Sequence, residues 1–331
     1  MYKQKLFKIT VSFISIMVLL LGASTIYVTQ FEKRSVQSKI VEIFLNAQGG
    51  KDIFTNREKL AEFMKEREKQ NEKSYVIPND VELISTVKEE NISGMQVLSL
   101  NRKKGKNKMQ ILYLHGGAYI NQPTNVHMTF LDKVASDTNA EITVPIYPKA
   151  PVHQFREAFE KVLPIYEELL TKTEPKNIVI MGDSAGGGFS LALSQMLLEK
   201  NLLQPGNIIL LSPWLDITMK NPLIPTFEDK DPMLGAYGLI EIGKAWAGDT
   251  DPNNFMLSPI NGPIKGLGNI TIFVGTHELF LPDARKFRDM AKEEGIAINY
   301  HEYPKMNHVF PTFPIPEGKK VIEEIMNIIN K

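Results

Sequence analysis

The chain has 331 residues, and its 38 basic side chains balance 38 acidic ones, so its formal charge is zero. No overall field attracts nucleic acid, and a dedicated DNA- or RNA-binding protein is not expected. Hydrophobic residues make up 43% of the chain and charged residues 23%, a balance that excludes dominant disorder. Because cysteine is absent, disulfides, thiolate metal sites and a cysteine nucleophile are excluded.

Residues 1–30 predict a membrane anchor or a signal segment. Lys3, Lys5 and Lys8 precede an uncharged run, residues 9–30, whose roughly 20 positions match a hydrocarbon core of about 30 Å. An uncleaved anchor is favoured, because a cleaved signal peptide has a shorter apolar region; the small residues 22–24 nevertheless offer a cleavage site. The leading lysines favour an extracytoplasmic globular part, which would be secreted if the segment were cleaved.

Residues 31–80 predict helices that cap the rest of the chain. Residues 38–47 and 56–72 both have helical periodicity, and the second stretch places Leu60, Phe63 and Met64 on one stripe. From residue 81 the pattern changes to strands, beginning with VELISTV. Residues 101–108 are polar and basic and predict a solvated hairpin turn rather than a binding patch.

Residues 81–331 predict one domain of the α/β class. Apolar strands alternate with helices, which indicates a mostly parallel sheet covered by helices on both faces. Residues 216–252 interrupt this alternation with turns rich in proline and glycine and one apolar helix, and are interpreted as an insertion.

The pattern G-x-S-x-G at residues 182–186 predicts a nucleophile at Ser184. It lies where the strand of residues 178–181 meets a helix, the context in which such a turn holds a serine hydroxyl clear of the sheet. The helix that begins at Ser184 points unpaired backbone N–H groups at any oxyanion formed there. A glycine turn that serves only helix–sheet packing is the alternative.

An oxyanion hole and a base are expected near Ser184. A second glycine loop, His115 to Ala118, directly follows a strand; the amides of Gly116, Gly117 and Ala185 are the predicted donors. His115 is expected to shape this loop. Among the six histidines, His308 is the expected base, since its loop follows the last strand and reaches the same sheet edge.

The third member of the predicted triad is an acid from the strand before His308. That strand delivers Glu278 and Asp283 to the sheet edge, and Glu278, which comes directly after the strand, is preferred, with Asp283 as the alternative acid. The chain order serine, acid, histidine is the one expected for this type of fold.

These motifs together resemble the hormone-sensitive-lipase-like branch of the α/β-hydrolase superfamily over about residues 81–331. The sequences that carry the resemblance, in chain order, are HGGA, IYPKAPVHQF, GDSAGG, SPWLD, DPM, Ser258-Pro259 and MNHVF. The resemblance implies an α/β-hydrolase fold in which the N-terminal helices and the insertion of residues 216–252 form a helical cap. It also implies Ser184 as nucleophile, His308 as base and Glu278 at the acid position. Two departures from the family pattern are Glu278, where aspartate is common, and Ala118, which replaces a third glycine and is expected to avoid positive φ.

The predicted activity is hydrolysis of carboxylic esters with short to medium acyl chains through an acyl-enzyme, without a metal or organic cofactor. Cleavage of amides or peptides by the same triad is one alternative, and a non-catalytic ligand-binding protein on a hydrolase scaffold is another. A membrane-tethered interaction module is a third. The expected partners are a small-molecule ester and, through residues 1–30, a membrane; the sequence leaves the oligomeric state open.

Overall fold

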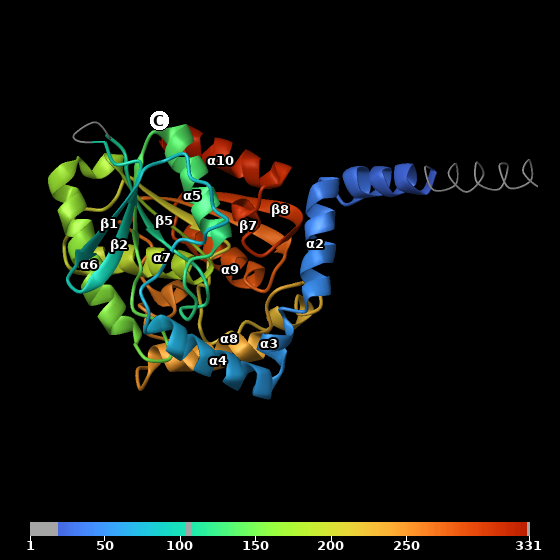
Figure 1. The fold of residues 1–331 in the computed structure, drawn as a ribbon, viewed down its shortest axis with the longest axis horizontal. Coiled ribbons are helices and arrows are strands. Elements are labelled where there is room, and N and C mark those ends of the chain that lie inside the picture. The colour runs from blue at the N-terminus through green and yellow to red at the C-terminus, as the bar shows by residue number, and fades with distance from the viewer. Residues whose placement is uncertain (1–18, 104–107, 330–331) are drawn as a thin grey trace, which may run out of the picture.

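The computed structural model describes residues 19–103 and 108–329 and has one eight-stranded sheet flanked by helices (Figure 1). The strands are β1 (Val87–Ile92), β2 (Met95–Leu100), β3 (Gln110–Leu114), β4 (Glu141–Pro145), β5 (Ile178–Asp183), β6 (Asn207–Leu211), β7 (Asn269–His277) and β8 (Asn299–Asn307). The α-helices are α2 (Val36–Gln48), α3 (Asp52–Thr55), α4 (Arg57–Asn71), α5 (Asn125–Thr138), α6 (Phe155–Lys172), α7 (Ser184–Glu199), α8 (Ala236–Ala247), α9 (Leu281–Glu293) and α10 (Pro316–Ile329). Short helical turns are η1 (Tyr27–Phe31), η2 (Pro175–Asn177), η3 (Ile224–Thr226), η4 (Pro259–Asn261) and η5 (Phe310–Thr312).

The sheet is mostly parallel, as predicted. Its strand order is β1-β2-β4-β3-β5-β6-β7-β8, with antiparallel pairing only at β1-β2 and β2-β4. The remaining neighbours are parallel, so the carboxyl ends of β5, β7 and β8 lie along one edge of the sheet. In open parallel sheets this edge is where ligands bind.

Alternating side chains of the buried strands pack into apolar cores on both faces of the sheet. Ile111, Val179 and Ile209 pack with α5 and α10 on one face. The neighbouring residues Leu112 and Ile180 pack with α6 and α7 on the other face. Because both faces are covered, strands such as β5 are apolar at nearly every position rather than at every second one.

The predicted cap regions come together at one end of the molecule. The helix α3 packs on α8, and in Figure 1 both lie next to α4 at the lower edge. Close approach requires glycine on α8: a Cβ at Gly238 would lie 2.5 Å from Phe54 Cα. The segment after α2, which holds α3 and α4, and the insertion after β6 therefore form one cluster of helices, although about 180 residues separate Phe54 from Gly238.

Residues 9–18 of the predicted membrane segment lie outside the described residues, and within the described ranges the structure contains no helix with the length and apolar character needed to span a bilayer.

The strand predicted at VELISTV is wrong, because residues 81–86 form a loop and β1 begins at Val87. The Asp132 carboxylate accepts hydrogen bonds from the backbone N–H groups of Ile84 and Ser85, so these groups do not join the sheet.

Candidate active site

Ser184 lies on a sharp turn between β5 and α7. Its φ is +53°, in the left-handed region that costs a non-glycine residue about 1–2 kcal/mol. Two glycines make the turn sterically possible: a Cβ at Gly182 would lie 2.3 Å from Gly186 O, and one at Gly186 would lie 1.9 Å from Leu114 O. The turn predicted from the glycine pattern is present, and it places the serine at the carboxyl end of β5.

Three side chains from distant parts of the chain meet at this edge in hydrogen-bonding geometry. The Ser184 Oγ lies 2.8 Å from His308 Nε2, and the His308 Nδ1 lies 2.8 Å from Glu278 Oε2. Ser184 follows β5, Glu278 follows β7 and His308 follows β8. All three residues are buried, with exposed fractions of 6%, 0% and 3% respectively. The arrangement can pass a proton from the hydroxyl to the imidazole while the carboxylate orients the ring.

The second carboxylate oxygen of Glu278 has its own partners. The Ser212 hydroxyl donates to Glu278 Oε1 over 2.9 Å, and the backbone N–H of Gly275 donates to the same oxygen. Burial raises the pKa of the Glu278 carboxyl above its ordinary value, and the hydrogen bond and charge of His308 oppose that rise. Ser212 therefore holds the carboxylate in place, a role that the sequence analysis did not assign.

Asp283, the alternative acid, is not brought to His308. It lies in the first turn of α9, where its Oδ1 accepts a hydrogen bond of 2.8 Å from the side chain of Asn221. Burial raises the pKa of Asp283 to about 6. Of the two acids proposed from the sequence, the structure places Glu278 against the imidazole and Asp283 elsewhere.

The predicted oxyanion hole needs one correction, because the Gly116 amide is already occupied. It donates a hydrogen bond of 2.8 Å to Asp183 Oδ1 and is not free to bind an oxyanion. In the described part of the chain, the next two amides of the loop, those of Gly117 and Ala118, have no hydrogen-bond partner. Ala185 lies in the first turn of α7, where amides have no partner within the helix. The available set of donors is thus Gly117, Ala118 and Ala185.

Ala118 does not avoid positive φ, so the sequence-based expectation for this position is wrong. Its φ is +54° and that of the following Tyr119 is +60°. Left-handed conformations at these residues cost about 1–2 kcal/mol each, and surrounding contacts must hold them. Tyr119 is buried and its ring stacks on Trp246 at 4.6 Å and on Trp214 at 5.6 Å. Packing of this ring holds the loop in its strained form.

Asp183, the residue before the serine, links the glycine loop of residues 115–118 to the sheet by hydrogen bonds. Besides the Gly116 amide, its Oδ1 accepts the Tyr113 hydroxyl at 2.6 Å, and its Oδ2 lies 3.2 Å from His127 Nε2. Burial alone would raise the pKa of Asp183, but the charge of His127 and these hydrogen bonds lower it to about 2. The sequence analysis missed this residue because it occupies the variable position of the motif; its place at the end of a buried strand was the available signal.

Removing the Asp183 carboxylate should impair turnover more than substrate binding. In Asp183→Ala the Tyr113 hydroxyl and Gly116 amide lose their acceptor, and we expect kcat to fall by about 10²-fold with little change in KM, as for a damaged oxyanion hole. Asp183→Asn keeps an acceptor oxygen and should retain most of the rate. The measurement is steady-state hydrolysis of p-nitrophenyl butyrate, with Asp137→Asn on the surface of α5 as the matched control. Equal losses in the alanine and asparagine variants would contradict this role.

His115 has structural partners within the glycine loop and beside it. His115 is fully buried, its Nδ1 lies 2.7 Å from Gly116 O, and its ring stacks on Tyr147 at 4.4 Å. The Tyr147 hydroxyl donates to the His115 carbonyl oxygen over 2.6 Å. His115 therefore shapes the loop, as expected from the sequence.

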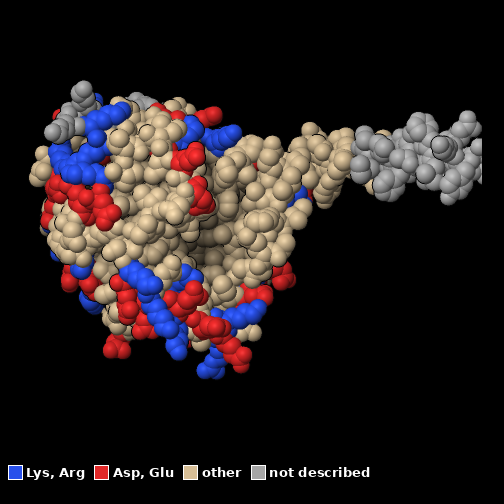
Figure 2. Space-filling view, viewed as in Figure 1, with Lys and Arg blue, Asp and Glu red and all other residues tan. Residues whose placement is uncertain are grey.

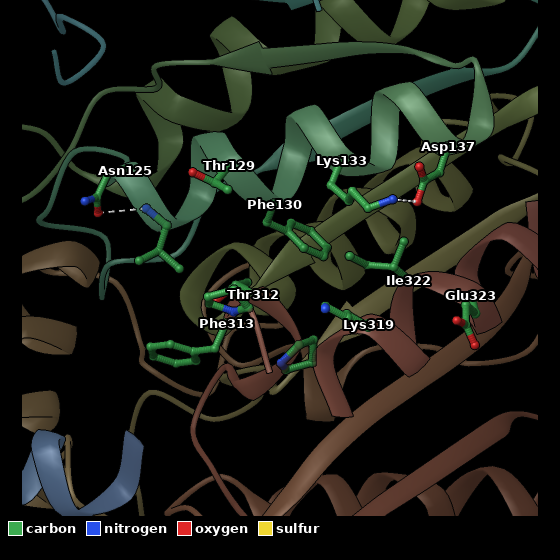
Figure 3. Close-up of a pocket in the computed structure, with 13 residues that line it drawn as sticks. Asn125, Thr129, Phe130, Lys133, Asp137, Thr312, Phe313, Lys319, Ile322 and Glu323 are labelled. Carbon is green, nitrogen blue, oxygen red and sulfur yellow. Dashed lines mark hydrogen bonds and ion pairs between the residues drawn. The ribbon is translucent and has the colours of Figure 1, made fainter. Parts of the chain in front are cut away.

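A groove between α5 and α10 is separate from these groups (Figure 3). It has a volume of about 460 Å³, and Figure 3 shows the Phe130, Phe313 and Ile322 side chains along it, with Lys319 and the Lys133–Asp137 pair nearby. None of its lining residues belongs to the cluster of Ser184, Glu278 and His308. Within the described residues, no group of His, Asp and Glu side chains could hold a metal ion.

Comparison with known protein families agrees with the geometry. Residues 111–312 match a family described by the alpha/beta hydrolase fold. An esterase from Acinetobacter venetianus is 31% identical over 219 residues, which cover 65% of this chain and 72% of that protein. An acetyl-hydrolase from Streptomyces hygroscopicus is 29% identical over 216 residues, covering 64% of this chain and 72% of the relative.

Solved structures are similar over most of the chain. A protein from Staphylococcus aureus superposes with a TM-score of 0.82 and 32% identity, covering 86% of this chain and 96% of that one. An esterase/lipase from an uncultured bacterium has a TM-score of 0.76 and 27% identity, covering 89% and 98% of the two chains. The similarity thus extends well beyond the matched family segment.

Proposed function

Because this chain belongs to the α/β-hydrolase family, is a carboxylesterase-like hydrolase and has motifs that resemble the hormone-sensitive-lipase-like branch, we propose that Ser184, His308 and Glu278 are its catalytic triad. The observation that carries the proposal is the continuous hydrogen-bonded path from Ser184 Oγ through the His308 ring to Glu278, with 2.8 Å at each step. A serine that only packs a helix on a sheet has no need of an imidazole held by a buried carboxylate.

The proposed reaction has two half-steps. The Ser184 hydroxyl attacks the ester carbonyl while His308 takes its proton, and the carbonyl oxygen becomes an oxyanion. The amides of Gly117, Ala118 and Ala185 stabilise that oxygen. The proton returns through His308 to the leaving alcohol, and an acyl group remains on Ser184. A water molecule then attacks the acyl carbon while His308 takes its proton. The bond between that carbon and Ser184 Oγ breaks, His308 returns the proton to Oγ, and the acid is released.

The substrate range proposed is carboxylic esters with short to medium acyl chains. Support comes from the family and from the relatives, one of which is named an acetyl-hydrolase. The test is a series of p-nitrophenyl esters from acetate and butyrate to octanoate and palmitate. We expect kcat/KM to be highest at acetate to octanoate, and a maximum at palmitate would contradict the chain-length proposal. Matched amides should be turned over much more slowly, and comparable rates would favour an amidase.

We also propose that residues 1–30 tether the enzyme to a membrane with its catalytic part outside the cytoplasm. Support comes from the sequence alone, where the leading lysines precede the uncharged run of residues 9–30. External protease added to intact cells should degrade the catalytic part of the full chain. A chain that stays protected until the cells are lysed would overturn this orientation.

A further inference from the structure

Exposed apolar side chains gather at the N-terminal end of the described chain. The large hydrophobic residues exposed there are Leu19, Leu20, Leu21, Ile26, Tyr27, Phe31, Ile40, Ile43 and Phe44. The last three form one helical stripe on α2, with spacing i, i+3 and i+4, and their exposed fractions are 60%, 56% and 59%. We call these three residues the α2 stripe. An apolar stripe at this spacing normally faces a protein core, so its exposure indicates a missing partner.

The opposite side of α2 is attached to the catalytic body by polar contacts. Glu42 pairs with Arg34 and lies 3.4 Å from His277, the residue before Glu278. Arg34 is 5% exposed and donates to the Lys305 carbonyl oxygen over 3.0 Å. The Ser35 backbone N–H and hydroxyl both donate to the Glu317 carboxylate on α10, at 2.6 and 2.8 Å. The orientation of α2 is therefore coupled to the strand ends that carry Glu278 and His308.

The residues directly before α2 resemble the boundary between an apolar membrane segment and water. Tyr27 and Phe31 are exposed, their rings stack at 5.8 Å, and the exposed Lys33 follows. Aromatic residues followed by basic ones are typical of membrane–water interfaces. Val36 is the fifth residue after Phe31, so a lipid surface at Phe31 would lie within about 18 Å of the start of α2.

A lipid surface fits the α2 stripe better than a second copy of the chain. The three residues of the stripe are apolar, and they follow the uncharged run of residues 9–30 after a short charged stretch, Glu32 to Arg34. In Figure 2 the surface over residues 19–31 and α2 is largely uncharged and borders a hollow in the body, whereas charged side chains gather over other parts of the visible face. An amphipathic helix close to a membrane anchor lies with its apolar face in the lipid interface.

We infer that the α2 stripe contacts the lipid surface and sets the orientation of the catalytic body, so that the enzyme takes esters held in or beside the bilayer. The substrate part of this inference rests on the proposed ester hydrolysis, and the lipid contact rests on the proposed membrane tether. Because α2 is attached beside Glu278 and His308, contact of the stripe with lipid brings the carboxyl edge of the sheet near the headgroups.

The first test measures lipid contact directly in the full chain reconstituted into phosphatidylcholine vesicles. Brominated lipids quench tryptophan fluorescence on contact, and the chain's own Trp214 and Trp246 are buried in the core. Phe44→Trp should be quenched clearly more than the parent. Leu203→Trp, at a site 63% exposed on the body, is the matched control and should resemble the parent. Equal quenching of the two variants overturns the inference. A tryptophan at position 44 that is shielded from lipid because the chain forms a dimer there also overturns it.

The second test separates a lipid-contact role from a merely structural one. The full chain with Ile40→Ser, Ile43→Ser and Phe44→Ser should turn over soluble p-nitrophenyl butyrate at the parent rate. Its rate on a p-nitrophenyl ester embedded in vesicles should fall by about fivefold or more. Ile84→Ser, at an 81% exposed site on the body, should leave both rates unchanged. An equal loss of rate on both substrates overturns the inference. If the parent has no activity on either substrate, the proposed function is overturned, and the quenching test alone decides whether the α2 stripe contacts lipid.

Discussion

Ser184→Ala is expected to lose ester turnover almost completely, with kcat/KM for p-nitrophenyl butyrate falling by about 10⁴-fold or more. The variant removes the only atom of this side chain that the His308 imidazole contacts, so no acyl-enzyme can form. Binding and the oxyanion donors survive, and a small residual rate is consistent with the proposal.

The variant should fold like the parent, because the lost hydroxyl is small and alanine meets the same left-handed backbone at residue 184. The matched control is Ser194→Ala on the same helix, whose buried hydroxyl donates to Ser190 O at 2.8 Å and is far along α7 from the turn. It should keep the parent rate. Unchanged turnover in Ser184→Ala, or failure of a fluorophosphonate to label the parent at this serine, removes Ser184 from the mechanism.

Glu278→Gln is expected to lower kcat by about 10³- to 10⁴-fold. Glutamine fits the same space, and its amide oxygen can still accept from Ser212, but the negative charge that stabilises the protonated His308 ring is gone. The amide can also present an N–H group to His308 Nδ1 and so favour the wrong tautomer. Thermal unfolding of the purified variant checks that the fold is intact.

Asp283→Asn is the matched control for the acid, since both carboxylates are buried and follow the same strand. Its carboxylate contacts Asn221 rather than His308, so the control should keep a rate within about threefold of the parent. If Asp283→Asn were the slower enzyme, the assignment of the acid would be reversed. Glu278→Asp should be intermediate, because the shorter side chain withdraws the carboxylate from the imidazole.

The amide of Gly116 illustrates how a correct motif can be assigned an incorrect atom. Consecutive glycines after a strand predict amides close to a ligand, and they do not show which amide is already paired. The answer depends on Asp183, which is 67 residues away in sequence and reaches the loop only because β3 and β5 are neighbours in the sheet. The same pairing draws in Tyr113 from β3, whose hydroxyl contact no local pattern could reveal.

Ala118 shows the opposite error, in which a local rule was applied too strictly. Alanine is disfavoured at positive φ, and the expectation of a negative φ followed from that preference alone. Long-range packing of Tyr119 between Trp246 and Trp214 overrides it. The stack involves the cap helix α8 and the segment after β6, elements that are remote from this loop in sequence.

By itself the sequence determined the class of fold, the serine turn and the order of serine, acid and histidine, because strand periodicity and glycine sterics are local properties. Only the tertiary structure showed that Glu278 rather than Asp283 contacts His308, that the Gly116 amide is paired with Asp183, and that α2 lies beside the strand ends with its apolar stripe outward. Those outcomes depend on which strands are neighbours and on which buried polar atoms find partners, and both are set by contacts between residues far apart in the chain.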